Sequence, residues 1–210
     1  MLLKLRTLIR NNPDYFGAVV SSYGVIGLQA VVQVLLVPLY VHTLGVYMFG
    51  VLSLLMAGVA IASLSLSWAY GSVLRVMGTA GARGAEDEFA DGYAAARWLF
   101  DGYAVVFSVI VVLAGLLFGP RFLADTPVAL RDDVIAAAIL AIAHCVVLVD
   151  LSVDQMALMV RRRQTIANSF LMLGILIFLA LVVPWLLLGG GAAGVFACLI
   201  LSNIVLRICT

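Results

Sequence analysis

No aspartate, glutamate, lysine or arginine occurs between Asp14 and Arg75, a run of sixty residues (15–74). A helix needs about 20 apolar residues to cross the ~30 Å hydrocarbon core of a bilayer. Sixty residues are too many for one crossing, and they fit two crossings joined by a tight turn. The segment VPLYVHTLGVYMFG (37–50) holds one proline and two glycines near the middle of the run, which marks the turn. The predicted membrane spans are 17–40 and 48–70.

The overall composition agrees with a membrane protein. Hydrophobic residues make up 65% of the 210-residue chain and charged residues only 11%, against about 25% in a soluble domain. A soluble fold of this size has no way to cover so much apolar surface. The 12 basic residues are scattered and give a net charge of +1, so no basic stripe of the kind that binds nucleic acid is present.

Four further apolar stretches follow, and we predict that each crosses the membrane once. Their approximate bounds are 99–118, 134–158, 167–187 and 193–208. The charged segments 75–97 and 119–133 are predicted to be loops in water, the first with room for a short surface helix from Asp87. The predicted fold is thus an all-α, polytopic membrane bundle of six transmembrane helices, forming a single domain over 1–210.

The distribution of basic residues orients this bundle. With the amino terminus in the cytoplasm, ten of the 12 basic residues fall in inner segments, and only Arg121 and Arg131 fall in outer ones. Such an excess of Lys and Arg is typical of cytoplasmic loops. An error of one in the number of spans would scramble this alternation. Both termini are therefore predicted to be cytoplasmic.

Asp150 and Asp154 are the clearest candidates for function within the spans, because ionisable groups in a bilayer are costly. They lie four residues apart, on one face of the predicted fourth span, and Asp150 is placed about 16 Å above Arg161, near mid-depth. Two such carboxylates suit coupling to a proton or cation. Alternatively, they line a wet inner vestibule or pair with the arginines at 161–163.

Uncharged polar residues and one arginine give a second group of candidates. Gln29 and Gln33 share a helix face, and an amide seldom faces lipid because it needs a hydrogen-bonding partner. That face is equally suited to lining a cavity and to contacting a neighbouring helix. Arg75, at the inner end of the second span, is either a positive-inside anchor or a contact for a lipid phosphate, since a guanidinium binds two phosphate oxygens well.

The sequence contains no pattern typical of an enzyme. It lacks HExxH, GxSxG, P-loop and glycine-rich phosphate-binding motifs. Its three cysteines are far apart and have no histidine at metal-binding spacing. We therefore expect no catalytic residues, no metal site and no cofactor.

Two stretches resemble the O-antigen and exopolysaccharide flippases of the multidrug, oligosaccharidyl-lipid and polysaccharide exporter superfamily. In the first, PLYVHTLGVYMFGVLSLLMAGVAIASLSLSWAYGSVLR, the matching elements are Pro38, Leu44-Gly45, Phe49-Gly50 and an apolar span that ends at Arg75. The second is DQMALMVRRRQTIANSFLMLGILIFLALVVPWLLLGGGAAGVFACLILSN, with a basic turn and then a glycine-rich turn. The chain departs from the family where SLSLSW (63–68) lacks an acidic residue common there.

The resemblance implies a function, a partner and a location. Family members have twelve to fourteen spans in two lobes, so six spans equal the amino-terminal lobe. A carboxy-terminal lobe is then missing, or two copies pair in parallel as a homodimer. The substrate would be a polyprenyl-pyrophosphate-linked oligosaccharide, flipped across the bacterial inner membrane by alternating access, with membrane lipids around the protein. On this view Arg75, Gln29 and Gln33 bind the glycan or phosphate, and Asp150 with Asp154 couples an ion.

Other functions stay open at this stage. One is a drug or cation exporter of the same superfamily, and another is a membrane subunit or truncated fragment that transports nothing. A membrane-embedded transferase is disfavoured, because segment 119–133 offers few polar groups for catalysis.

Overall fold

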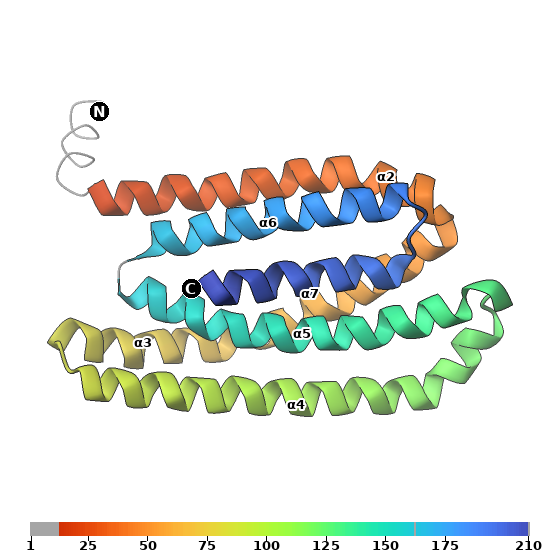
Figure 1. Ribbon diagram of the computed structural model, residues 1–210. Coiled ribbons are helices and arrows are strands. Elements are labelled where there is room, and N and C mark those ends of the chain that lie inside the picture. The colour runs from red at the N-terminus through yellow and green to blue at the C-terminus, as the bar shows by residue number, and fades with distance from the viewer. Residues whose placement is uncertain (1–12, 162, 210) are drawn as a thin grey trace, which may run out of the picture.

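The computed structural model describes residues 13–161 and 163–209, which form a bundle of long helices without a strand in this part of the chain (Figure 1). Four of the helices are long and apolar enough to cross a membrane, and α7 is a shorter apolar helix. The prediction of an all-α chain able to enter a membrane is therefore confirmed at this level. The elements are α2 (Pro13–Ser65), α3 (Ser67–Arg83), α4 (Glu86–Ala124), the short 3₁₀ helix η1 (Val128–Leu130), α5 (Arg131–Val160), α6 (Gln164–Leu187) and α7 (Ala192–Cys209).

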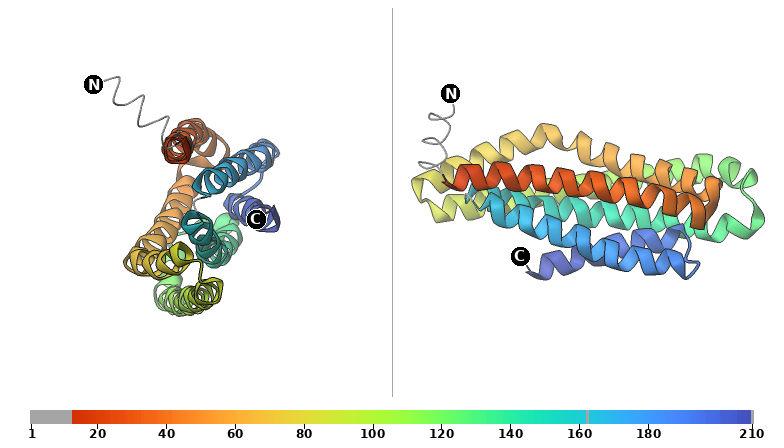
Figure 2. Two further views of the ribbon diagram at one scale, coloured as in Figure 1. Left: turned by 90° about the vertical axis from the view of Figure 1, so that its left-hand side faces the viewer. Right: turned by 90° about the horizontal axis from the view of Figure 1, so that it is seen from above.

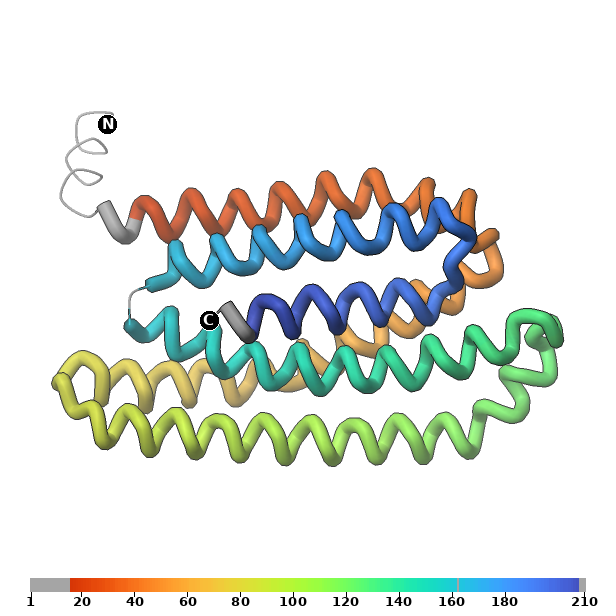
Figure 3. Tube along the Cα trace, viewed as in Figure 1, coloured from red at the N-terminus to blue at the C-terminus, as the bar shows by residue number. Residues whose placement is uncertain are grey.

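Helix α2 reverses direction inside its 53 residues. Gly45 has φ 79° and ψ 163°, outside the helical region, and the ribbon turns back there at one end of the bundle (Figures 1 and 3). This backbone conformation is open essentially to glycine alone, because a Cβ atom would clash. We call residues 13–44 the first arm of α2 and residues 46–65 its second arm. The predicted turn within 37–50 thus lies at Gly45.

The segment 75–97 is helical except at a short turn, so the prediction of a loop there was wrong, while a helix does start beside Asp87. Helix α3 continues to Arg83, and α4 begins at Glu86. Gly84 closes α3 in the left-handed conformation (φ 70°), and its backbone N–H lies against the carbonyls of Ala80 and Gly81. Most charged residues of the segment are exposed, while a stripe on each helix packs inward, which is the pattern of an amphipathic helix. The buried residues are Met77 and Ala80 on α3, and Phe89 and Ala96 on α4.

The segment 119–133 is also more helical than predicted. Helix α4 continues through Pro120 to Ala124, η1 follows, and α5 starts at Arg131. Arg131 donates from Nε to the carbonyl oxygen of Thr126 at 3.1 Å and so holds this connection together. The remaining helices begin and end within three residues of the predicted spans: α5 covers 131–160, α6 covers 164–187 and α7 covers 192–209.

Helix α5 is the central helix of the bundle. It packs against α2, α3, α4, α6 and α7, and the view along the bundle places it between the others (Figure 2). Its sequence explains this position, because small or branched residues recur at every fourth place and all are buried. Such a stripe lets neighbouring helices approach closely. The residues of the stripe are Ala137, Ala141, Cys145, Val149 and Val153.

Replacing Gly45 is expected to destabilise the bundle. Gly45→Val forces a branched side chain into a conformation with positive φ, at a cost of about 1–3 kcal/mol in the free energy of unfolding. Gly50→Ala is the control, since nothing lies within 4 Å of a Cβ built there and its backbone is helical. Denaturant unfolding in detergent measures both variants. Equal stability of Gly45→Val and the wild type would contradict the assigned turn.

Candidate functional site

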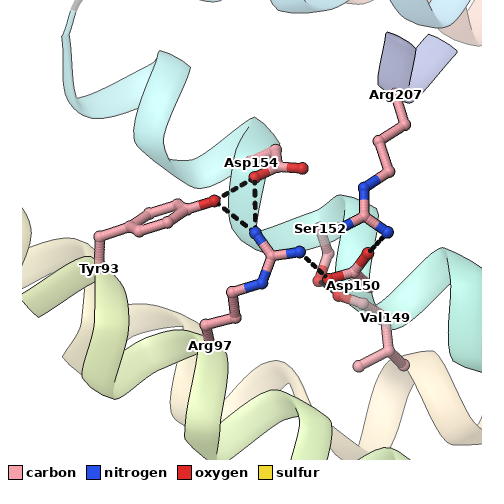
Figure 4. Close-up of polar contacts among 7 residues, drawn as sticks. All are labelled: Tyr93, Arg97, Val149, Asp150, Ser152, Asp154 and Arg207. Atoms are coloured by element: carbon pink, nitrogen blue, oxygen red, sulfur yellow. Dashed lines mark hydrogen bonds and ion pairs between the residues drawn. The ribbon is translucent and has the colours of Figure 1, made fainter.

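Charged side chains from three helices meet around Asp150 (Figure 4). The carboxylate of Asp150, on α5, is 12% exposed and has a guanidinium on each side. Arg97 of α4 donates from Nη2 to Oδ1 at 2.6 Å, and Arg207 of α7 forms an ion pair with Oδ2. A carboxylate this enclosed needs such partners, because a buried unpaired charge is strongly unfavourable.

Asp154 belongs to the same network, one helical turn further along α5. Its Oδ1 accepts a hydrogen bond from the Tyr93 hydroxyl at 2.5 Å and lies 3.7 Å from Nη1 of Arg97. Arg97 also donates from Nη1 to the Tyr93 oxygen at 2.8 Å. One arginine thus connects both carboxylates. We refer to Tyr93, Arg97, Asp150, Asp154 and Arg207 as the charged network.

The antiparallel packing of α4 and α5 explains these pairings. Four residues separate Arg97 from Tyr93 on α4, and four separate Asp150 from Asp154 on α5, in the opposite direction. The same register continues eleven residues further along both helices. There Arg161, at the end of α5, pairs with Glu86 of α4 at 3.0 Å. The three contacts are therefore consequences of one helix–helix register.

Helix α7 runs parallel to α5, and its position is set at its first turn. The carboxylate of Asp133 accepts hydrogen bonds from the backbone N–H groups of Ala192 at 2.9 Å and Ala193 at 3.1 Å. A negative charge at a helix amino terminus satisfies free N–H groups and opposes the positive end of the helix dipole. This contact, with the packing of α7 along α5, brings Arg207 alongside Asp150.

Among the described residues, neither Arg161 nor Arg163 is a partner of Asp150 or Asp154. Arg161 pairs with Glu86, and its guanidinium lies 4.6 Å from the centre of the Phe89 ring. Arg163 is exposed, and Arg162 lies outside the described residues. The carboxylates obtain their counter-charges from α4 and α7 instead, because packing brings these helices beside α5.

The other predicted site residues lie apart from the charged network. Gln29 and Gln33 are exposed on the first arm of α2, and Arg75 is exposed on α3. Among the described residues, the side chains of these three have no hydrogen bond or ion pair. The structure therefore brings Asp150 and Asp154 together but leaves the predicted glycan-binding residues open on the surface.

Tyr93, Arg97 and Arg207 were not identified from the sequence as parts of a site. In the sequence, Arg97 and Arg207 stand out only as two of the basic residues that orient the bundle. A signal was available, because α4 and α5 form a hairpin that turns just after Ala124. Arg97 and Asp150 are almost equally far from that turn, 27 and 26 residues away. Opposite charges at equal distances from the turn between two antiparallel helices are expected to pair across the hairpin.

The chemistry of the network follows from its charges. Two carboxylates face two guanidinium groups, so the cluster is balanced while both aspartates are ionised. A proton or a cation bound by Asp150 competes directly with Arg97 and Arg207. Within the described residues, no group of three or more His, Cys, Asp or Glu side chains is arranged to hold a metal ion.

Comparisons with protein-family models, with curated proteins and with solved structures found no match for this chain.

Breaking the Arg97–Asp150 contact is expected to weaken the bundle. Arg97→Gln removes the charge that joins both carboxylates, and the loss is about 1–3 kcal/mol in the free energy of unfolding. Combining it with Asp150→Asn in a double-mutant cycle is expected to give a coupling of about 1 kcal/mol or more. Arg83→Gln, an exposed arginine on α3, is the control. Additive effects of Arg97→Gln and Asp150→Asn would contradict a direct interaction.

Proposed function

We propose that the chain is a six-span bundle that serves as one lobe of a transporter and flips a polyprenyl-pyrophosphate-linked oligosaccharide across the bacterial inner membrane. The observation that carries the proposal is the exposure of Gln29 and Gln33 on the first arm of α2, whose other exposed residues are mostly apolar. A bilayer gives such amides no partner. They suit a polar cavity that the lobe shares with a second lobe.

The helices support a count of six spans. The two arms of α2 run in opposite directions, so each is a candidate crossing, and α4, α5, α6 and α7 add four more (Figure 1). On α4 the uncharged stretch between Asp101 and Arg121 has 19 residues, about 28 Å of helix. This length matches the ~30 Å of hydrocarbon in a bilayer. Asp101 itself lies inside α4, which begins at Glu86, fifteen residues earlier.

Helix lengths also revise the proposed depth of Asp150. Arg97, its partner on α4, precedes Asp101 and so lies outside the uncharged stretch of that helix. Helices α3, α4 and α5 therefore extend beyond the hydrocarbon on that side. In this arrangement the charged network lies at the edge of the hydrocarbon rather than at mid-depth, within reach of protons from the water.

The turns between helices support the proposed orientation. The α3–α4 turn and the α5–α6 turn lie at one end of the bundle, and the α4–α5 connection lies at the other (Figure 3). Helix α7 runs towards the first end and stops short of it. Most of the described basic residues belong to the first end, which the positive-inside rule assigns to the cytoplasm. They are Arg75, Arg83, Arg97, Arg161, Arg163 and Arg207.

The roles of individual residues follow from this arrangement. Arg75 is exposed at the middle of α3, a helix that runs towards the cytoplasmic α3–α4 turn, and its guanidinium can bind the pyrophosphate of a substrate entering from the inner leaflet. Gln29 and Gln33 contact the glycan. Asp150 and Asp154 couple transport to a proton or cation, which enters by displacing arginine.

The proposed topology predicts which residues react from each side of the membrane. In a cysteine-free background, Ala85→Cys in the α3–α4 turn is expected to label with an impermeant maleimide only from the cytoplasmic side. Asp125→Cys in the α4–α5 connection is expected to label only from the opposite side. Labelling of both positions from one side would contradict the proposed topology.

The proposed function predicts a specific loss of translocation. The chain is reconstituted in vesicles with a fluorescent polyprenyl-pyrophosphate oligosaccharide, and an impermeant quencher reports how much lipid has crossed. Gln29→Leu with Gln33→Leu, and separately Asp150→Asn, are expected to slow translocation about tenfold, which corresponds to losing one good hydrogen bond or ion pair in the transition state.

Two controls separate transport from insertion. Val34→Leu changes an exposed apolar neighbour on α2, and Asp132→Asn removes an exposed charge outside the network, so both are expected to translocate normally. If vesicles with the wild-type chain translocate the oligosaccharide no faster than empty vesicles, the proposal is contradicted. That result would favour a non-transporting subunit. Movement of an organic cation instead of the oligosaccharide would indicate a drug exporter.

A further inference from the structure

An apolar groove runs between the second arm of α2, α4 and α5. It has a volume of about 620 Å³, and only apolar residues and glycines line it. Along α4 it extends from Phe107 to Leu123, about 24 Å of helix. This part of the bundle lies towards the α4–α5 connection, away from the charged network.

The groove exists because side chains are missing along its walls. Gly58 on α2 and Gly115 and Gly119 on α4 line it, and a Cβ atom built at any of the three meets nothing within 4 Å. Pro120 then interrupts the hydrogen bonding of α4, which favours a bend at this end of the helix. The three glycines therefore leave the space of the groove unfilled, at the end of α4 where Pro120 favours a bend.

The shape and lining of the groove select its occupant. Ordered water needs two to four polar partners, and this lining is almost entirely apolar. An empty groove would forfeit dispersion contacts along its whole length. A flexible hydrocarbon chain fills such a space. The groove's extent along α4 is greater than the ~15 Å of one leaflet's hydrocarbon, so it is long enough to hold an acyl chain.

Two charged residues at the end of α4 indicate the headgroup. Arg121 and Asp125 lie four residues apart, beside the groove residues Phe122 and Leu123. Both are exposed, and neither has a hydrogen-bonding or ion-pair partner for its side chain among the described residues. Arg121 is complementary to a phosphate, and Asp125 is complementary to an ammonium group.

We propose that this groove binds one acyl chain of a zwitterionic aminophospholipid, with its phosphate at Arg121 and its ammonium group at Asp125. In the proposed orientation the lipid occupies the outer leaflet. The inference requires the chain to be inserted in a membrane, but it does not depend on transport. A chain that fails to flip oligosaccharide still tests it.

Photocrosslinking tests the tail position. The full chain is placed in nanodiscs that contain phosphatidylethanolamine with a photoreactive group on its acyl chain, and adducts are mapped by peptide mass spectrometry. Adducts are expected to concentrate in peptides covering 107–123 and 134–145. Gly115→Leu and Gly119→Leu fill the groove and are expected to lower these adducts about fivefold, a modest loss in binding free energy.

Gly102→Leu is the matched control for the tail position. It adds the same side chain to the same helix, at an exposed site outside the groove, and it is expected to leave the adducts unchanged. Adducts spread evenly over the exposed helix faces would overturn the proposal. So would adducts that Gly115→Leu and Gly119→Leu leave at the wild-type level.

Competition with unlabelled lipid tests the headgroup. Phosphatidylethanolamine is expected to compete about threefold better than phosphatidylglycerol in the wild type, because only the former offers an ammonium group to Asp125. Asp125→Asn is expected to abolish this preference, and Arg121→Gln is expected to weaken competition by both lipids. Both residues are exposed, so these variants leave the core intact. Equal competition by the two lipids in the wild type would overturn the headgroup assignment.

Discussion

The antiparallel packing of α4 against α5 is the constraint on which the arrangement of charges depends. One register places Arg97 beside Asp150, Tyr93 beside Asp154 and Arg161 beside Glu86. A shift of one residue rotates each side chain by about 100° around its helix, away from its partner. The small residues along α5 allow the close approach that sets this register, so apolar packing and ion pairing support each other.

The sequence was sufficient where charge and hydropathy change together. The bounds of α5, α6 and α7 follow from long apolar runs that end at an arginine cluster or at glycines. The helical segment 75–97 was missed because its charges were interpreted as signs of a loop. Met77 with Ala80 on α3, and Phe89 with Ala96 on α4, carry the opposite signal, since each pair has helical spacing and is buried. In an amphipathic helix the charges mark only the exposed face.

The charged network was only half predictable for a different reason. Asp150 and Asp154 stand out in any single helix, because aspartate in an apolar segment is rare. Arg97 and Arg207 do not, since arginine near a helix end fits the positive-inside pattern. Pairing depends on which residues of different helices lie at the same height along the bundle. The pattern of each span by itself does not contain this information. The hairpin turn after Ala124 supplies this information for Arg97, whereas Arg207 requires the position of α7.

The first arm of α2 shows that this bundle provides partners for some polar side chains and not for others. Asn168 of α6 is buried, and its Nδ2 donates to the hydroxyls of Ser21 and Ser22 at 2.8 and 2.9 Å. About two turns further along the same arm, Gln29 and Gln33 are exposed without such contacts. The α2–α6 packing therefore satisfies amides where it buries them. The two glutamines face outward on a helix whose other exposed residues are mostly apolar, and on the proposed function their partner is a polar surface outside this bundle.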